Sequence, residues 1–207
     1  MPSFEQVCAK FFPDAGFPKK LLIGGLLSFI PILNFLALGY LYRYSLQVRE
    51  KGLITLPEWE DWQGLFLDGV IFFIIILIFG GAPAIAIGTL AFISAALADF
   101  LHVPLLGDTI LLLPLTVTLF LLCPLLTMSA LYRFQTQRDI NDLLPVDAFL
   151  KHVFAGIERK IIPTLAFAGL MLVGWPIYGF PFFLGFAAVI AYFNILFIHL
   201  EKDDNII

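Results

Sequence analysis

The sequence predicts an all-α fold, a polytopic helical membrane protein with about four to six membrane helices. Hydrophobic residues make up 60% of its 207 residues and charged residues 14%, whereas soluble proteins average about half and about a quarter. Four stretches contain no Asp, Glu, Lys or Arg, and each reaches the roughly 20 residues that a helix needs to cross a bilayer. These stretches are 21–42, 69–98, 109–132 and 161–200. Because proline and glycine interrupt them, we expect broken segments.

Residues 1–20 predict an amphipathic segment rather than a cleaved signal peptide. Ser3 and Gln6 have the spacing of a capping box, and an apolar stripe follows until Pro13. Such a helix lies either at the lipid headgroups or on the surface of its own protein, and the sequence leaves both open.

The first membrane segment is expected over 21–44, with a kink or re-entrant shape at Pro31 and Asn34. Three tyrosines in its last turns, at positions 40, 42 and 44, predict a membrane interface. Gly52 is then a natural end for the helix.

A polar segment, here called the first elbow (residues 43–68), follows this span. Thr55 has the spacing to cap a new helix with Glu58, and Pro57 suits a first helical turn. We therefore expect a short amphipathic helix lying flat at the membrane surface. Its acidity makes a protein surface a better partner than anionic lipid.

A second elbow predicts an internal duplication. Leu131-Tyr132-Arg133-Phe134 parallels Leu41-Tyr42-Arg43-Tyr44, and an apolar helical stripe follows Pro145. The expected organisation is one membrane domain, 1–207, with two related halves that each contain an interfacial amphipathic helix. The halves are 21–101 and 108–200, and 201–207 is a polar tail.

The later spans are expected to be broken as well. Residues 69–100 are too long for one straight crossing, so we expect a tilt or a break near Gly80–Pro83. GWPIYGFP, residues 174–181, predicts a tight helical hairpin. Lysine and arginine concentrate in the elbows and are absent from 102–108, which predicts cytoplasmic elbows and an outer loop at 102–108.

The sequence offers no catalytic, cofactor or metal site. The hydrocarbon-length runs hold no acidic or basic residue, and there is no nucleophile with a base, no phosphate loop and no metal-ligand spacing. We expect a protein that is not an enzyme. A net charge of −4 argues against nucleic acid as a partner. His152, beside Lys151, is expected to be exposed.

The elbows are therefore the candidate interaction site. One interpretation is an internal brace, in which arginines pair with acidic groups. The other is a docking surface with the tryptophan pair as its anchors. The expected partners are membrane lipids and another membrane or peripheral protein, and a homo-oligomer stays open. The candidate interaction residues are Arg43, Arg49, Pro57, Glu58, Trp59, Glu60, Asp61, Trp62, Arg133 and Arg138.

The stretch GYLYRYSLQVREKGLITLPEWEDW, residues 39–62, resembles a known family. With Gly24, Gly25 and Pro31 upstream and FLDG at 66–69 downstream, it is similar to the prokaryotic membrane proteins called domain of unknown function 4013. The resemblance is carried by residues 20–70. It implies an uncharacterised multi-pass protein of the prokaryotic inner membrane, and it brings no activity or substrate.

Two functions are compatible with these features. The first is a non-enzymatic scaffold or accessory subunit that acts through the first elbow. The alternative is a small transporter or lipid-handling protein for an uncharged solute or lipid, because such cargo requires no charge at membrane depth.

Overall fold

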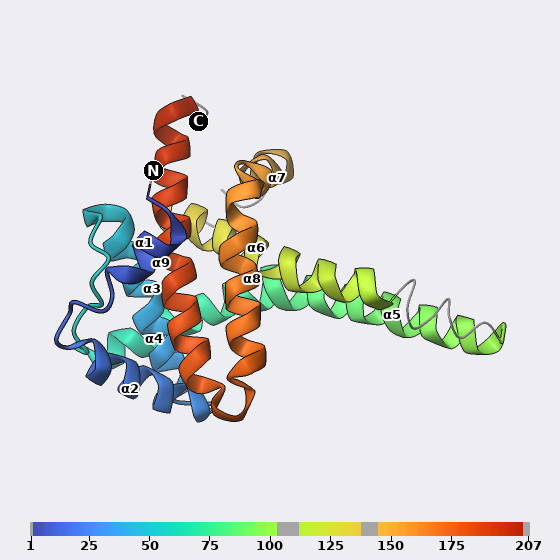
Figure 1. Ribbon diagram of the computed structural model, residues 1–207, viewed down its shortest axis with the longest axis horizontal. Helices are drawn as coiled ribbons and strands as arrows, with labels where there is room; N and C mark the ends of the chain where they lie inside the picture. The colour runs from blue at the N-terminus through green and yellow to red at the C-terminus, as the bar shows by residue number, and fades with distance from the viewer. Residues whose placement is uncertain (1, 103–111, 138–144, 205–207) are drawn as a thin grey trace.

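The computed structural model describes residues 2–102, 112–137 and 145–204, and these are helical or loop, with no strand among them. Helices α2 (Phe17–Phe29), α3 (Asn34–Lys51), α8 (Ile157–Val173) and α9 (Gly179–Asp204) form a bundle, with α1 (Phe4–Ala9) packed on α9 (Figure 1). One long helix, α4 (Trp62–Ile76) continued by α5 (Ala82–Phe100), crosses this bundle and projects from it. Helix α6 (Leu112–Gln137) runs back beside α5. The all-α class is therefore confirmed.

The N-terminal half begins as expected. Helix α1 (Phe4–Ala9) has the complete Ser3–Gln6 capping box, although it ends before Pro13. Val7 and Phe11 are buried against the rest of the chain, so the segment packs on its own protein. Helix α2 (Phe17–Phe29) and helix α3 (Asn34–Lys51) are separate, which confirms the break near Pro31. Helix α3 ends at Gly52 with a φ of 65°.

The tyrosine prediction is wrong. Tyr40, Tyr42 and Tyr44 are buried, with at most 5% of each side chain exposed. Their rings pack inside the bundle because α3 is surrounded by α2, α4 and α9.

The amphipathic helix expected from Thr55 is also wrong. Residues 52–61 are extended, and helix α4 (Trp62–Ile76) begins at its N-cap, Asp61. Consequently, among the described residues, only the second half has a separate amphipathic helix at the predicted place. That helix, α7 (Val146–Phe154), buries Phe149 and Val153 on one face.

The break expected at Gly80–Pro83 is absent. A π-helical turn, η1 (Leu77–Gly81), joins α4 to α5 (Ala82–Phe100), and the helix stays continuous. Pro83 is accommodated at the start of α5, where the π turn has already interrupted the regular hydrogen-bond ladder.

Four further helices lie within the described residues 112–137 and 145–204 of the C-terminal half. Helix α6 (Leu112–Gln137) leads by way of α7 to α8 (Ile157–Val173). A 3₁₀ turn (Trp175–Ile177) then reverses the chain into α9 (Gly179–Asp204), which confirms the hairpin predicted at 174–181. Helix α9 is the central element, because it contacts α1, α2, α3, α6 and α8.

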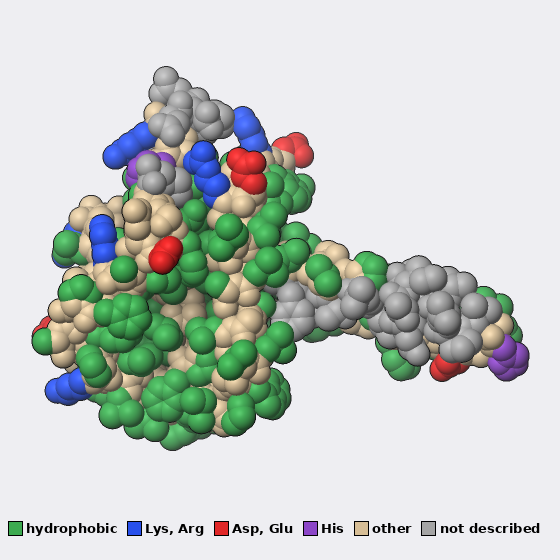
Figure 2. All heavy atoms as spheres, viewed as in Figure 1, with side chains coloured by type: hydrophobic (Ala, Val, Ile, Leu, Met, Phe, Trp, Pro, Cys, Tyr) green, Lys and Arg blue, Asp and Glu red, His purple; other side chains and the backbone are tan. Residues whose placement is uncertain are grey.

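Among the residues that the structure describes, two helices are long and apolar enough to cross a membrane, Trp62–Phe100 and Gly179–Lys202. The first is exposed over most of its length, and its side chains include Phe92, 75% exposed, and Phe100, 79% exposed. Figure 2 shows charged side chains gathered mainly at the end of the molecule with α7 and the C-terminal end of α9. The opposite end, around the α8–α9 turn, is covered by hydrophobic side chains.

Candidate functional site

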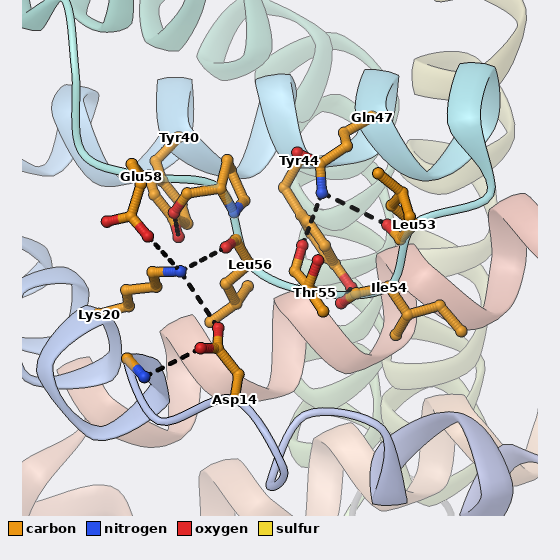
Figure 3. A network of polar contacts seen from close by, with 12 residues as sticks. Asp14, Lys20, Tyr40, Tyr44, Gln47, Leu53, Ile54, Thr55, Leu56 and Glu58 are labelled. Carbon is orange, nitrogen blue, oxygen red and sulfur yellow. Dashed lines mark hydrogen bonds and ion pairs between the residues drawn. The ribbon is translucent and has the colours of Figure 1, made fainter.

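The extended part of the first elbow, here called the strap (residues 52–61), lies along one face of α3. Tyr40 and Tyr44 donate their hydroxyls to the carbonyls of Pro57 and Ile54, at 2.6 and 2.8 Å. The Gln47 amide donates to the carbonyl of Thr55 at 2.6 Å and to that of Leu53 at 3.5 Å. Figure 3 shows these bonds side by side along the strap.

Helical spacing explains why α3 holds an extended segment. Tyr40, Arg43, Tyr44 and Gln47 follow the i, i+3, i+4, i+7 pattern, so their side chains lie on one face. Each ends in a donor that reaches a strap carbonyl. Because these side chains already donate to the strap carbonyls, a non-helical strap does not leave those buried acceptors unsatisfied.

Lys20 joins α2 to the strap. Its ammonium lies 2.7 Å from the carbonyl of Leu56, 2.8 Å from the Glu58 carboxylate and 3.1 Å from Asp14 (Figure 3). The lysine is 6% exposed. Hydrogen bonds from the Gly16 backbone and from Lys20 lower the pKa of Asp14, which keeps that carboxylate charged. Glu58 thus pairs with a lysine of α2 instead of completing a capping box with Thr55.

Arg43 closes the other end of the strap. Its guanidinium contacts Asp61 at 2.8 Å and Asp68 at 2.6 Å, and Nη1 lies 3.5 Å from the carbonyl of Glu60. Asp61 has a φ of 52°, and its side chain accepts a hydrogen bond from the Gly64 backbone, so it caps α4. The Arg43 hydrogen bond lowers the pKa of Asp61. These contacts support the brace interpretation for Arg43, Glu58 and Asp61.

The tryptophans form an aromatic stack beside the strap. Trp59 lies 4.0 Å from the Tyr40 ring and 5.7 Å from the Trp62 ring, measured between centroids. Trp59 is half-buried, whereas Trp62 is 47% exposed. The indole N–H of Trp59 is buried and has no hydrogen-bond partner among the described residues. Trp59 is therefore mainly an internal contact, and Trp62 forms the outer edge.

The second elbow is arranged differently. Arg49, from the end of α3, lies over the Tyr132 ring at 5.3 Å and so links α3 to α6. Arg133 is half-buried on α6, and Arg138 lies outside the described residues. The ion pairs of the strap network are formed by Lys20 with Asp14 and Glu58, and by Arg43 with Asp61 and Asp68.

The prediction that His152 is exposed is wrong. Its ring stacks on Phe197 at 4.2 Å and on Tyr132 at 5.6 Å, and Nε2 is buried without a partner among the described residues. Burial, with the charges of Lys160 and Arg133, lowers the pKa of His152 to about 3. Lys160 is fully buried and donates to the carbonyls of His152 and Val153, which end α7. Sequence reasoning missed this pair because it depends on Lys160, near the start of α8, reaching back to the carbonyls at the end of α7.

A buried polar chain connects α3, α6 and α9. Ser45 donates to the Gln135 side chain at 2.8 Å and accepts from Asn194 at 3.0 Å. Gln135 also donates to the carbonyl of Tyr42. These bonds hold the two halves of the chain together at the centre of the bundle.

The contacts at the strap brace α2, α3 and α4 against one another and leave an exposed edge that includes Glu60 and Trp62. Within residues 2–102, 112–137 and 145–204, His, Cys, Asp and Glu form no group that could hold a metal ion. The sequence reasoning missed Asp14, Lys20, Tyr40, Tyr44 and Gln47 as members of the site. The helical spacing on α3 was the available signal for the last three.

The comparisons with known proteins agree with the resemblance noted for residues 20–70. No curated protein and no solved structure matches the chain. One family model matches residues 23–190, which extends well beyond the first elbow and through most of both halves. The chain therefore belongs to the family described as protein of unknown function (DUF4013).

Proposed function

We propose that the protein is a multi-pass protein of the prokaryotic inner membrane that acts without chemistry of its own, as a scaffold or accessory subunit. The exposed apolar side chains of α5 and α8 support the membrane location, because water would not favour such surfaces. In this arrangement α8 and α9 cross as a hairpin, and the basic residues near the start of α8 and the end of α9 stay on the cytoplasmic side.

The observation that carries the scaffold role is the outer edge of the braced strap. Glu58 and Asp61 are held by Lys20 and Arg43, yet their side chains remain 70% and 62% exposed. Glu60 is exposed beside them, and Trp62 adds an exposed indole. A rigid edge loses little conformational entropy on binding, and tryptophan is a frequent anchor at interfaces. The partner is a membrane or peripheral protein with a basic surface.

The brace determines which variants test this role. Charge reversal at Glu58 or Asp61 would disturb the strap itself, so the informative variants are Glu60→Lys and Trp62→Ala. The tagged protein is purified from its native membrane in a gentle detergent, and mass spectrometry identifies what travels with it. We expect a stoichiometric partner that is lost from both variants.

The matched control is Glu50→Lys, which makes the same change of charge at an exposed position at the end of α3. The control should retain the partner. A partner that stays bound to Glu60→Lys and Trp62→Ala, or no stoichiometric partner in the wild type, contradicts the scaffold role.

A further inference from the structure

An apolar groove lies between the N-terminal segment and the α8–α9 hairpin. Its volume is about 250 Å³, and it is open along part of its length. Phe4, Cys8 and Phe11 form the wall on the N-terminal side. Ala166 on α8 and Gly185 on α9 belong to the opposite wall. This groove is separate from the strap.

Small residues create the space. Gly185 and Ala188 are one turn apart on α9, and Ala166 faces the groove from α8. A Cβ at Gly185 would lie 2.5 Å from the Phe167 ring, so the helices approach closely here. The small side chains on these two helices leave a gap, lined by apolar side chains, between the hairpin and the rings of the N-terminal segment.

The volume matches a length of hydrocarbon chain. At about 30 Å³ for a group the size of a water molecule, 250 Å³ holds roughly eight methylene groups. The neighbouring surface of α8 is apolar as well, with Ile162 66% exposed and Leu165 53% exposed. A lipid chain could pass from the bilayer into the groove without crossing a polar surface.

Positive charge stands at one end of the groove. Arg159 is exposed and precedes Ala166 by seven residues, so it lies on the same face of α8, about 10 Å along the axis. On α9, the Tyr192 ring packs against Phe4 of the groove wall at 5.6 Å. Lys10, exposed, lies in the chain between Cys8 and Phe11. The basic end of the groove faces the charged end of the molecule.

From this combination we infer that the groove binds one acyl chain of an anionic membrane phospholipid, with its phosphate near Arg159. The N-terminal segment covers the chain, so the bound lipid differs from the lipid that surrounds the exposed helices. The site depends on the proposed membrane location and is independent of the docking role of the strap.

Photolabelling tests the site. The full chain is reconstituted in phosphatidylcholine vesicles with a small fraction of phosphatidylglycerol that carries a diazirine on its acyl chain. Adducts are mapped by peptide mass spectrometry after irradiation. We expect adducts on residues 4–12, inside the groove, in excess over adducts on the exposed face of α5. Equal labelling of the two regions would mean bulk lipid contact only and would overturn the proposal.

Groove-filling variants give the second measurement. Ala166→Phe and Leu170→Trp enter the groove from successive turns of α8, and Ala86→Phe places the same bulk on α5. Displacing about two methylene groups costs about a tenfold loss of affinity. We expect this loss of labelling on 4–12 in both groove variants and none in the α5 variant, with melting curves to confirm folding. Unchanged labelling in both groove variants overturns the proposal.

Two further measurements test the position of the lipid headgroup and the alternative that a second copy of the chain fills the groove. Arg159→Gln should reduce the excess of phosphatidylglycerol labelling over labelling by a matched phosphatidylcholine probe, and an unchanged excess overturns the assignment of the phosphate. If a second copy of the chain fills the groove, residues 4–12 stay unlabelled in the wild type and Ala166→Phe converts a dimer to a monomer. That result also overturns the lipid proposal.

Discussion

Gly39 of α3 and Gly69 of α4 lie opposite each other where the two helices cross, and neither position has room for a side chain. A Cβ on Gly39 would collide with the backbone of Leu65, and a Cβ on Gly69 would collide with the backbone of Phe35. Such close crossings place helix backbones in direct contact and are typical of small residues. This crossing sets the angle at which α4 leaves the strap.

Replacing either glycine by alanine should therefore destabilise the protein. Overpacking at a tight contact costs about 1–3 kcal/mol, which exceeds the gain of about 0.5–1 kcal/mol that alanine brings to a helix. Thermal melting in detergent should show a lower midpoint for Gly39→Ala and Gly69→Ala. Gly88→Ala on α5 is the control, because a Cβ there meets nothing within 4 Å, and its midpoint should stay or rise.

Replacing Lys20, which joins α2 to the strap, should lower the free energy of unfolding. Lys20→Met leaves the Leu56 carbonyl without its donor and the Asp14 carboxylate without its cation. Unsatisfied groups of this kind cost about 1–3 kcal/mol each, and the exposure of Glu58 limits its share. The melting midpoint should fall. Lys19→Met, the same change at the exposed neighbour, should leave it within error, and equal midpoints for the two variants would exclude a role for Lys20.

The tyrosines of α3 should control access to the strap. Tyr40→Phe and Tyr44→Phe together remove the donors to the carbonyls of Pro57 and Ile54, at about 1 kcal/mol for each bond. The strap should then open more often, and a glutamate-specific protease should cleave after Glu58 or Glu60 about thirtyfold faster, because the two bonds together contribute about 2 kcal/mol on this scale. Cleavage after Glu158, on α8, serves as the internal reference and should not change. A cleavage rate in the strap equal to that of the wild type would contradict the bracing role.

Acid should weaken the packing of α7 through His152. Its pKa is about 3 in the folded chain and 6.5 for an unburied histidine, so the folded protein holds fewer protons between these values. Neutral, buried His152 therefore does not lower the free energy of unfolding above pH 6.5. As the pH falls from 6.5 toward 3, His152 lowers this free energy by about 1.4 kcal/mol for each pH unit. His152→Phe keeps a ring between Tyr132 and Phe197 and should flatten this decline.

The measurement is the melting midpoint from pH 7.5 to 4.5 for the two proteins. Asp14 and Asp61 also have lowered pKa values, but their contribution is lost only near and below pH 4, where carboxylates of the unfolded chain begin to bind protons. An equal decline in His152→Phe over the higher range would mean that other groups cause it.

The sequence predicted the structure correctly where neighbouring residues alone decide the backbone conformation. The Ser3–Gln6 capping box, the end of α3 at Gly52, the break near Pro31 and the hairpin after Gly174 depend on backbone preferences and on contacts within a few positions. The apolar stripe of α7 was also predicted correctly, because apolar residues with a 3.6-residue period form one face of a helix that can be buried. These features, with the long uncharged runs, determined the all-α class and the order of the helices.

The tertiary structure alone decided the form of the first elbow. Thr55, Pro57 and Glu58 carry a helix-start signal, yet Tyr40, Tyr44, Gln47 and Lys20 satisfy the strap carbonyls from helices that precede it in the chain. The same holds for His152, which Tyr132 and Phe197 enclose. Hydrogen bonds and burial supplied by distant segments outweigh a local preference of about 1 kcal/mol. The sequence by itself therefore determined which segments outside the first elbow are helical, and tertiary contacts decided that the strap is extended.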